Sequence, residues 1–268
     1  MRTIARVASA VFRESVRDRV PLSIVAFAVV LMAASYLISQ LTAGQDLKII
    51  KDLGLAAITV LGLFIAIFIG IGLVSKEVER RSIYSLLSKP LSRDQFILGK
   101  FLGLVTTLAV NVAAMTLAYY AVLFYMNATA SVSTRAGWQT PAADPRLLVA
   151  VLLVFAELLV VTAVAMFFST FSTPLPSAFL TLCLWIAGHF NADLRTFETV
   201  IDSAPVVWLA RVLYYVLPNL APFDVKAEAV YGITITPAHV GFTLLYAVVY
   251  IGVLLMAAMA IFRRRDFK

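Results

Sequence analysis

The chain has 268 residues, of which 62% are hydrophobic and 14% are charged, and its mean hydropathy is +0.94. Soluble domains contain roughly 45–50% apolar and about 25% charged residues, so this composition excludes an ordinary water-soluble fold. The net charge of +7 does not indicate a nucleic-acid partner, because most basic residues lie beside apolar segments, where anionic lipid accounts for them. We therefore expect an all-α, polytopic membrane protein with one transmembrane domain over residues 1–268.

The first 20 residues predict an amphipathic helix that lies on the membrane surface. Apolar residues recur at three- and four-residue spacing, and arginines occupy the remaining faces. The apolar residues are Ile4, Val7, Ala8, Val11, Phe12 and Val16, and the basic ones are Arg2, Arg6, Arg13, Arg17 and Arg19. A signal peptide is the alternative, but the apolar run that follows exceeds the roughly 7–15 residues of a signal-peptide core.

Six apolar segments predict six membrane-spanning helices. All but the fifth come near or exceed the roughly 20 residues that a bilayer requires. The segments cover residues 21–41, 53–75, 98–126, 147–171, 175–190 and 240–262. Three begin with an N-cap residue followed by proline, at Asp144-Pro145, Thr173-Pro174 and Thr236-Pro237, which predicts where these helices start.

The basic residues predict the orientation of the chain. The N-terminal segment, the connection between the second and third spans, and the C-terminal segment together hold 15 of the 22 Lys and Arg residues. Cytoplasmic loops carry such an excess, so we expect both termini to be cytoplasmic. Termini on the same side require an even number of spans, which agrees with six. The expected location is the inner or plasma membrane of the cell.

The predicted external connection between the fifth and sixth spans contains a short apolar stretch over residues 205–217. This stretch is too short to cross a bilayer, and its aromatic residues suit the headgroup boundary, so we predict a re-entrant or interfacial helix. The candidate residues of an external gate are Trp208, Arg211, Tyr214 and Tyr215. The alternative is an anchored loop that has no gating role.

The cytoplasmic connection between the second and third spans predicts a short helix, an elbow and a cytoplasmic extension of the third span. The short helix ends near Pro90, because proline disfavours helix in the residue before it. A new helix starts at Ser92, which has capping-box spacing to Gln95. The apolar stripe of the short helix consists of Val78, Ile83, Leu86 and Leu87. This helix either lies solvated at the membrane surface or docks into a groove of a soluble partner.

The order of motifs in this connection resembles the first cytoplasmic loop of ABC-2-type permeases, the membrane subunits of ATP-binding-cassette transporters. Glu77-x-Glu79 precedes Leu86-Leu87-x-x-Pro90-x-Ser92-Arg93, and Gly99-Lys100 follows. The loop is most similar to that of the permease subgroup of the copper-enzyme maturation system for nitrous oxide reductase, although Arg81-Ser82 stands where many members carry Gly-Thr. The resemblance extends to the order of the spans and to Leu217-Pro218-Asn219 followed by Phe223-Asp224.

This resemblance implies an exporter permease whose cytoplasmic helix couples it to a separate ATPase. The implied coupling residues are Glu77, Glu79, Arg80, Arg81, Ile83, Leu86, Leu87, Pro90, Ser92 and Arg93. The sequence has no Gly-x-x-x-x-Gly-Lys-Ser/Thr phosphate loop, so we expect the chain itself to be neither an enzyme nor the holder of a cofactor. ATP and Mg are expected in two copies of the partner ATPase. A second permease, either a further copy or a paralogue, completes the expected assembly.

Glu157 is the acidic residue that lies well inside a predicted span. An ionisable group at that depth is costly unless it is paired, protonated or facing water. Polar packing and a role in the translocation path are both open, and Asn111 in the third span is the most obvious candidate partner. His189, which ends the fifth span, is more typical of an interfacial hydrogen-bonding residue than of a metal ligand, so no metal site is expected.

Small residues predict two close helix contacts. Gly62, Ala66 and Gly70 recur at four-residue spacing in the second span, and Gly99 and Gly103 do so at the start of the third.

Two other functions are open on the sequence. A proton-coupled secondary transporter would use Glu157 as a proton relay, and inverted repeats would favour it. A membrane-anchored assembly or maturation factor would share the permease plan without transporting a substrate.

Overall fold

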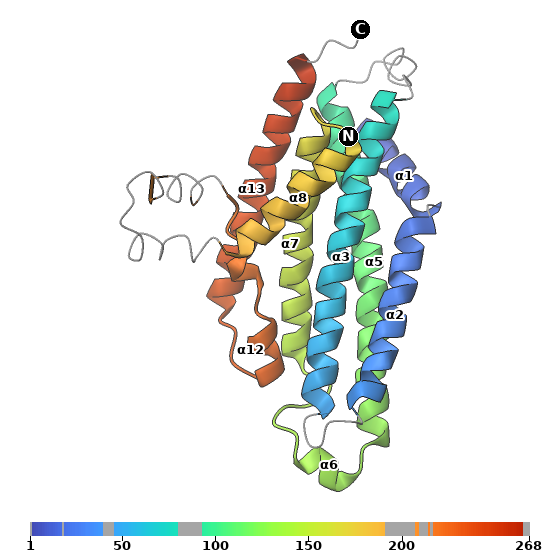
Figure 1. Ribbon diagram of the computed structural model, residues 1–268, viewed down its shortest axis with the longest axis vertical. Helices are drawn as coiled ribbons and strands as arrows, with labels where there is room; N and C mark the ends of the chain where they lie inside the picture. The colour runs from blue at the N-terminus through green and yellow to red at the C-terminus, as the bar shows by residue number, and fades with distance from the viewer. Residues whose placement is uncertain are drawn as a thin grey trace.

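The computed structural model describes residues 2–17, 19–39, 46–79, 93–190, 207–208, 214 and 217–264. The regular elements in these ranges are all helical, and the long helices form an elongated bundle (Figure 1). In chain order they are α1 (Arg2–Arg17), α2 (Arg19–Ser39), α3 (Asp46–Glu79), α5 (Arg93–Thr129), α6 (Val132–Ala136), α7 (Pro145–Ser169), α8 (Pro174–His189), η1 (Ala221–Phe223), α12 (Lys226–Tyr231) and α13 (Pro237–Arg264). The expected all-α fold is confirmed.

Four helices in the described residues are long and apolar enough to cross a membrane: α3, α5, α7 and α13. They correspond to the second, third, fourth and sixth predicted spans. Two shorter apolar helices, Pro21–Ala34 within α2 and Pro174–His189, correspond to the first and fifth. The helices α7, α8 and α13 begin at the prolines that the sequence singled out.

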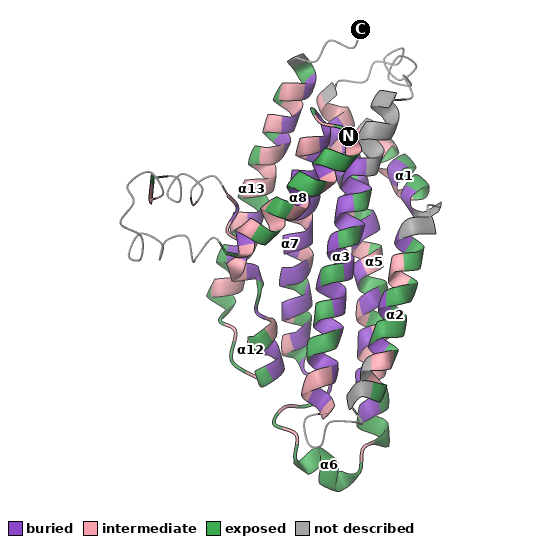
Figure 2. Ribbon diagram, viewed as in Figure 1, coloured by how far each residue is buried: buried purple, intermediate pink, exposed green. Residues whose placement is uncertain are grey.

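The centre of the bundle is the contact between α3 and α7, the two helices richest in buried residues (Figure 2). A Cβ placed on Gly62 would lie 2.5 Å from Cδ1 of Leu158, and one placed on Gly70 would lie 2.7 Å from Cβ of Ala165. These glycines therefore let the two helices approach closely. The packing face predicted on the second span is confirmed, and its partner is α7.

The N-terminal helix α1 packs against the start of α5. A Cβ on Gly103 would lie 2.6 Å from Cβ of Val11, and one on Gly99 would lie 2.7 Å from Cβ of Val7. The second predicted packing face is thus also confirmed. Part of the apolar stripe of α1 is used by α5, while Arg6 and Arg13 are exposed, as expected for the polar face of an interfacial helix.

Helix α8 ends level with the middle of α7, because its last residue, His189, lies beside Glu157. The segment that begins at residue 217 lies beside the end of α8, because the backbone amide of Leu220 donates to the Gly188 carbonyl at 3.0 Å. Gly232, with φ of 75°, closes α12 next to Thr140. Residues 217–232 therefore pass along the half of the bundle that α8 does not reach.

A hydrogen-bonded network ties the helices together at the end of the bundle that carries α6 (Figure 1). Lys51 of α3 is fully buried, and its Nζ donates to Thr140 Oγ1 and to the Pro141 carbonyl, both at 2.8 Å. From α5, the Tyr119 hydroxyl donates to the Lys51 carbonyl and the Tyr120 hydroxyl to the Asp144 carbonyl, each at 3.2 Å. The network joins α3, α5 and the segment that leads into α7.

The N-caps of α7 and α8 differ, and this gives a matched test. Asp144 Oδ1 accepts from the Arg146 amide at 2.9 Å, whereas Thr173 makes no side-chain cap bond. We expect Asp144→Ala to lower the free energy of unfolding by about 1 kcal/mol, because an orphan N–H loses its acceptor. Thr173→Ala should change it by less than about 0.5 kcal/mol. Thermal unfolding in detergent, followed by circular dichroism, measures both; equal losses would contradict the assignment.

Candidate polar site at the contact of α7 and α8

Glu157 is completely buried in the middle of α7 and points to α8. The indole N–H of Trp185 donates to Glu157 Oε1 at 2.6 Å. His189 Nε2 lies 3.5 Å from the same oxygen. Among the residues that the structure describes, Glu157 Oε2 has no hydrogen-bond partner. One carboxylate oxygen thus binds the neighbouring helix while the other stays unpaired, an arrangement that is costly inside a protein.

The two partners of Glu157 are also held against each other. His189 Nδ1 lies 3.1 Å from the Trp185 carbonyl, and because a carbonyl oxygen only accepts, Nδ1 carries the hydrogen of that bond. The two rings lie 4.7 Å apart between centroids. Residues 185 and 189 are one helical turn apart, so both side chains fall on one face of α8. This face of α8 is thereby fixed against α7.

The structure does not bring Asn111 to Glu157 as a hydrogen-bond partner. The Asn111 amide nitrogen donates to the Thr107 carbonyl of its own helix at 2.8 Å. The polar partner of Glu157 comes instead from α8. Within the described residues, no three His, Cys, Asp or Glu side chains gather to hold a metal ion.

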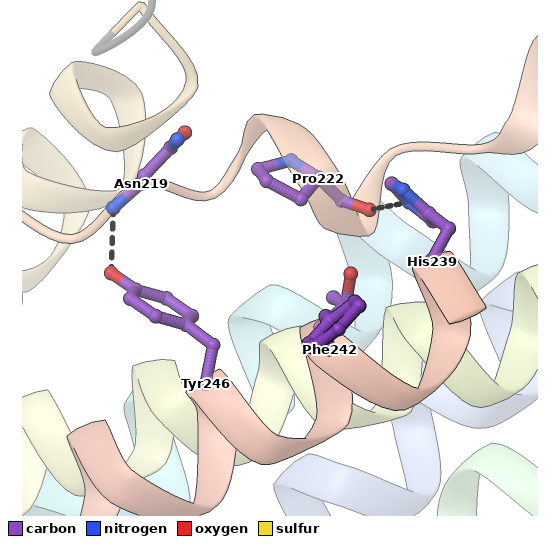
Figure 3. Close-up of a pocket in the computed structure, with 6 residues that line it drawn as sticks. Asn219, Pro222, His239, Phe242 and Tyr246 are labelled. Carbon is purple, nitrogen blue, oxygen red and sulfur yellow. Dashed lines mark hydrogen bonds between the residues drawn. The ribbon is translucent and has the colours of Figure 1, made fainter.

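A surface pocket of about 350 Å³ lies where the segment after residue 217 meets the start of α13 (Figure 3). Its lining residues are Asn219, Pro222, His239, Phe242, Thr243 and Tyr246. The backbone N–H of Asn219 donates to the Tyr246 hydroxyl oxygen, and His239 Nε2 donates to the Pro222 carbonyl, both at 2.9 Å. These bonds fasten residues 219–222 to α13. The polar atoms of the wall therefore serve mainly to hold the pocket together.

At the end of the bundle that lies away from α6, an ion pair joins α5 to α13. Arg263 Nε donates to Asp94 Oδ1 at 2.9 Å, and Nη2 donates to Oδ2. Such a two-bonded arginine–carboxylate pair fixes the orientation of both groups. Asp94 is the second residue of α5, directly after the connection whose resemblance to ABC-2 permeases implies a docking element.

The chain was compared with protein families and with curated proteins. The family described as ABC-2 family transporter protein matches residues 6–267, nearly the whole chain. The chain belongs to the ABC-2 transporter family. It is therefore a membrane permease component of an ABC transporter and is not itself the catalytic subunit. The comparison with curated proteins gives no match.

ABC-2 permeases work with ATP-binding-cassette ATPases, generally as dimers. In this ABC-2 permease the predicted coupling residues 80–92 lie outside the described residues. Glu77, Glu79 and Arg93 are described as backbone at the ends of α3 and α5. Of the external gate candidates, Trp208 is exposed and Tyr214 is partly buried, whereas Arg211 and Tyr215 lie outside the described residues.

Sequence reasoning missed two features of this permease. Trp185 precedes His189 by one helical turn, and this spacing could have identified a shared polar face directed at Glu157. The pair formed by Asp94 and Arg263 leaves no such signal, because the two residues are 169 positions apart in the chain.

Proposed function

We propose that this permease forms the translocation path of an exporter and that residues 77–93 dock a separate ATPase. The observation that carries the proposal is the family match over residues 6–267 together with the motif order between α3 and α5. The family resemblance implies a hydrophobic or amphiphilic substrate or one of another chemical class, and no motif of the sequence identifies it.

The proposed orientation places the docking segment in the cytoplasm. The ends of α3 and α13 and the start of α5 lie at one end of the bundle, while α6 and α12 lie toward the other (Figure 1). The end with the docking segment is also the one where the sequence concentrates Lys and Arg, as cytoplasmic loops do. Both termini then face the cytoplasm.

The proposed topology has six crossings, and the fifth is composite. Helix α8 has 16 residues and is about 24 Å long, which is less than the ~30 Å of a hydrocarbon core. Residues 217–232 continue from the end of α8 toward the start of α7. Where this part is not α-helical, its backbone bonds to protein, as in the turn bonds of residues 220–225, which is the condition for irregular chain at membrane depth.

The docking proposal is tested by copurification of the tagged permease with its candidate ATPase from detergent. We expect the triple variant Glu79→Ala, Leu86→Ala, Leu87→Ala to lose the ATPase, because truncated interface anchors typically cost about 2 kcal/mol each. Three such losses together should raise the dissociation constant by more than ~100-fold. Circular dichroism and gel filtration check that the variant is folded and inserted.

A matched control replaces Val132, Thr134 and Arg135 of the exposed helix α6 with alanine at the other end of the bundle. This variant should retain the ATPase. A wild-type permease that is folded but binds no ATPase would overturn the proposal and favour a proton-coupled transporter. An ATPase that binds without any stimulation of its turnover would favour a maturation factor.

A further inference from the structure

The contact between α5 and α13 at the docking end of the bundle contains more than an ion pair. Phe96 stacks on Phe262 with ring centroids 6.2 Å apart and an angle of 20° between the ring planes. Phe262 is buried, and Lys100 places its Nζ 4.6 Å from the centre of the Phe96 ring. The ion pair Asp94–Arg263 therefore lies beside an apolar contact that connects the same two helices.

Ion pairs at protein surfaces usually contribute little stability, since water screens both charges. The Asp94 side chain is 29% exposed and that of Arg263 is 62% exposed, so stability is not the main effect to expect here. The geometry of the pair is more informative. Two parallel bonds between a guanidinium and a carboxylate hold both groups in one plane and define where the end of α13 sits relative to α5.

The first turns of α5 are a junction between three helices. On one side, Val7 and Val11 of α1 pack against Gly99 and Gly103. Toward α13 lie Asp94 and Phe96. A displacement of the start of α5 must therefore either carry α1 and α13 with it or break these contacts. Packed elements of this kind move as rigid bodies rather than deforming continuously.

We propose that the Asp94–Arg263 pair makes α13 follow the first turn of α5, so that nucleotide-driven movement of the docked ATPase reaches the last span through this contact. The proposal rests on the proposed function, namely that residues 77–93 dock the ATPase. Asp94 and Arg263 act as positioning residues: they touch neither nucleotide nor transported substrate, and they set which helix moves with the docking segment.

The test uses the complete complex of permease and ATPase in detergent, with Cys183→Ser to remove the native thiol. A single reporter cysteine is placed at Ala260, an exposed position close to the docking end of α13. Its reaction rate with a water-soluble maleimide is measured with and without a non-hydrolysable ATP analogue. We expect a nucleotide-dependent rate in the wild-type background and the loss of that dependence in Asp94→Asn and in Arg263→Gln.

The exchanged pair Asp94→Arg with Arg263→Asp should restore the nucleotide dependence, because it restores the ion pair. Lys226→Gln, which neutralises another paired cation on α12, should leave the dependence intact. Copurification of the ATPase is recorded for every variant. A wild type that does not bind the ATPase would contradict the proposed function. A wild type that binds the ATPase but shows no nucleotide response on α13 would contradict only the role of the Asp94–Arg263 pair.

Several results would overturn the proposal. These are reporters on α13 that do not respond to nucleotide in the wild type, single variants that keep the response, or an exchanged pair that fails to restore it. A measurement on the permease alone adds an independent test. Asp94→Asn and Arg263→Gln should be non-additive in a double-mutant cycle of thermal stability, and strict additivity would mean that the two side chains do not interact.

Discussion

Replacing Gly54 with alanine should lower the melting temperature of the permease by about 4–8 °C, which corresponds to about 2 kcal/mol for a chain of this size. A Cβ at this position would fall inside the van der Waals contact distance of the Tyr119 ring. The ring cannot swing away, because Tyr119 is buried and its hydroxyl donates to the Lys51 carbonyl. Thermal unfolding in detergent, followed by circular dichroism, measures the effect.

Gly252→Ala is the matched control for this substitution. Nothing approaches within 4 Å of a Cβ built on Gly252, which lies in the interior of α13. Alanine has the higher helix propensity, so this variant should be more stable than the wild type by up to about 1 kcal/mol. A Gly54→Ala variant that melts at or above the wild-type temperature would contradict the close contact of α3 and α5.

The second large effect is expected at Glu157. Glu157→Leu removes the acceptor of the Trp185 indole N–H and leaves a partly buried donor unpaired. We expect it to lower the free energy of unfolding by about 1–3 kcal/mol. Glu157→Gln keeps an amide oxygen that can take the place of Oε1, so it should lower the free energy of unfolding by less than Glu157→Leu does. Thermal unfolding of both variants gives the comparison.

The glutamine variant also separates a structural role from a functional one. If its stability and its stimulation of the ATPase both match the wild type, Glu157 serves to join α7 to α8. A glutamine variant that melts normally and no longer supports transport would place Glu157 in the translocation path. If glutamine destabilises as much as leucine, the contact of the carboxylate with His189 matters more than the bond from Trp185.

The long apolar segments could be predicted from the sequence because hydropathy and proline starts act locally. The helices α7 and α13 begin at Pro145 and Pro237, next to the predicted N-cap residues, and α5 begins at Arg93, one residue after Ser92. The packing faces on α3 and α5 could also be predicted. Small residues at four-residue spacing indicate that another helix approaches, and this spacing can be read from one helix alone.

The partners of these faces could not be predicted, because they depend on how distant segments fold together. Asn111 was the obvious candidate to pair with Glu157, yet it bonds within its own helix, and Trp185 takes the place that it was expected to fill. The fifth predicted segment, residues 175–190, forms one helix, α8. No local pattern reveals that the chain after residue 217 continues from the end of this helix.

The network around Lys51 determines how the bundle can deform. At that end α3, α5 and the start of α7 are joined by hydrogen bonds from Lys51, Tyr119 and Tyr120. At the other end, within the described residues, α5 is joined to α13 by the partly exposed Asp94–Arg263 pair and to α1 by apolar contacts. In the proposed orientation, a force applied at the docking end therefore acts on helices that are held together at their other end by this network. We expect the helices to tilt about the Lys51 network, with the largest displacement at the docking end and little change at the end that carries α6.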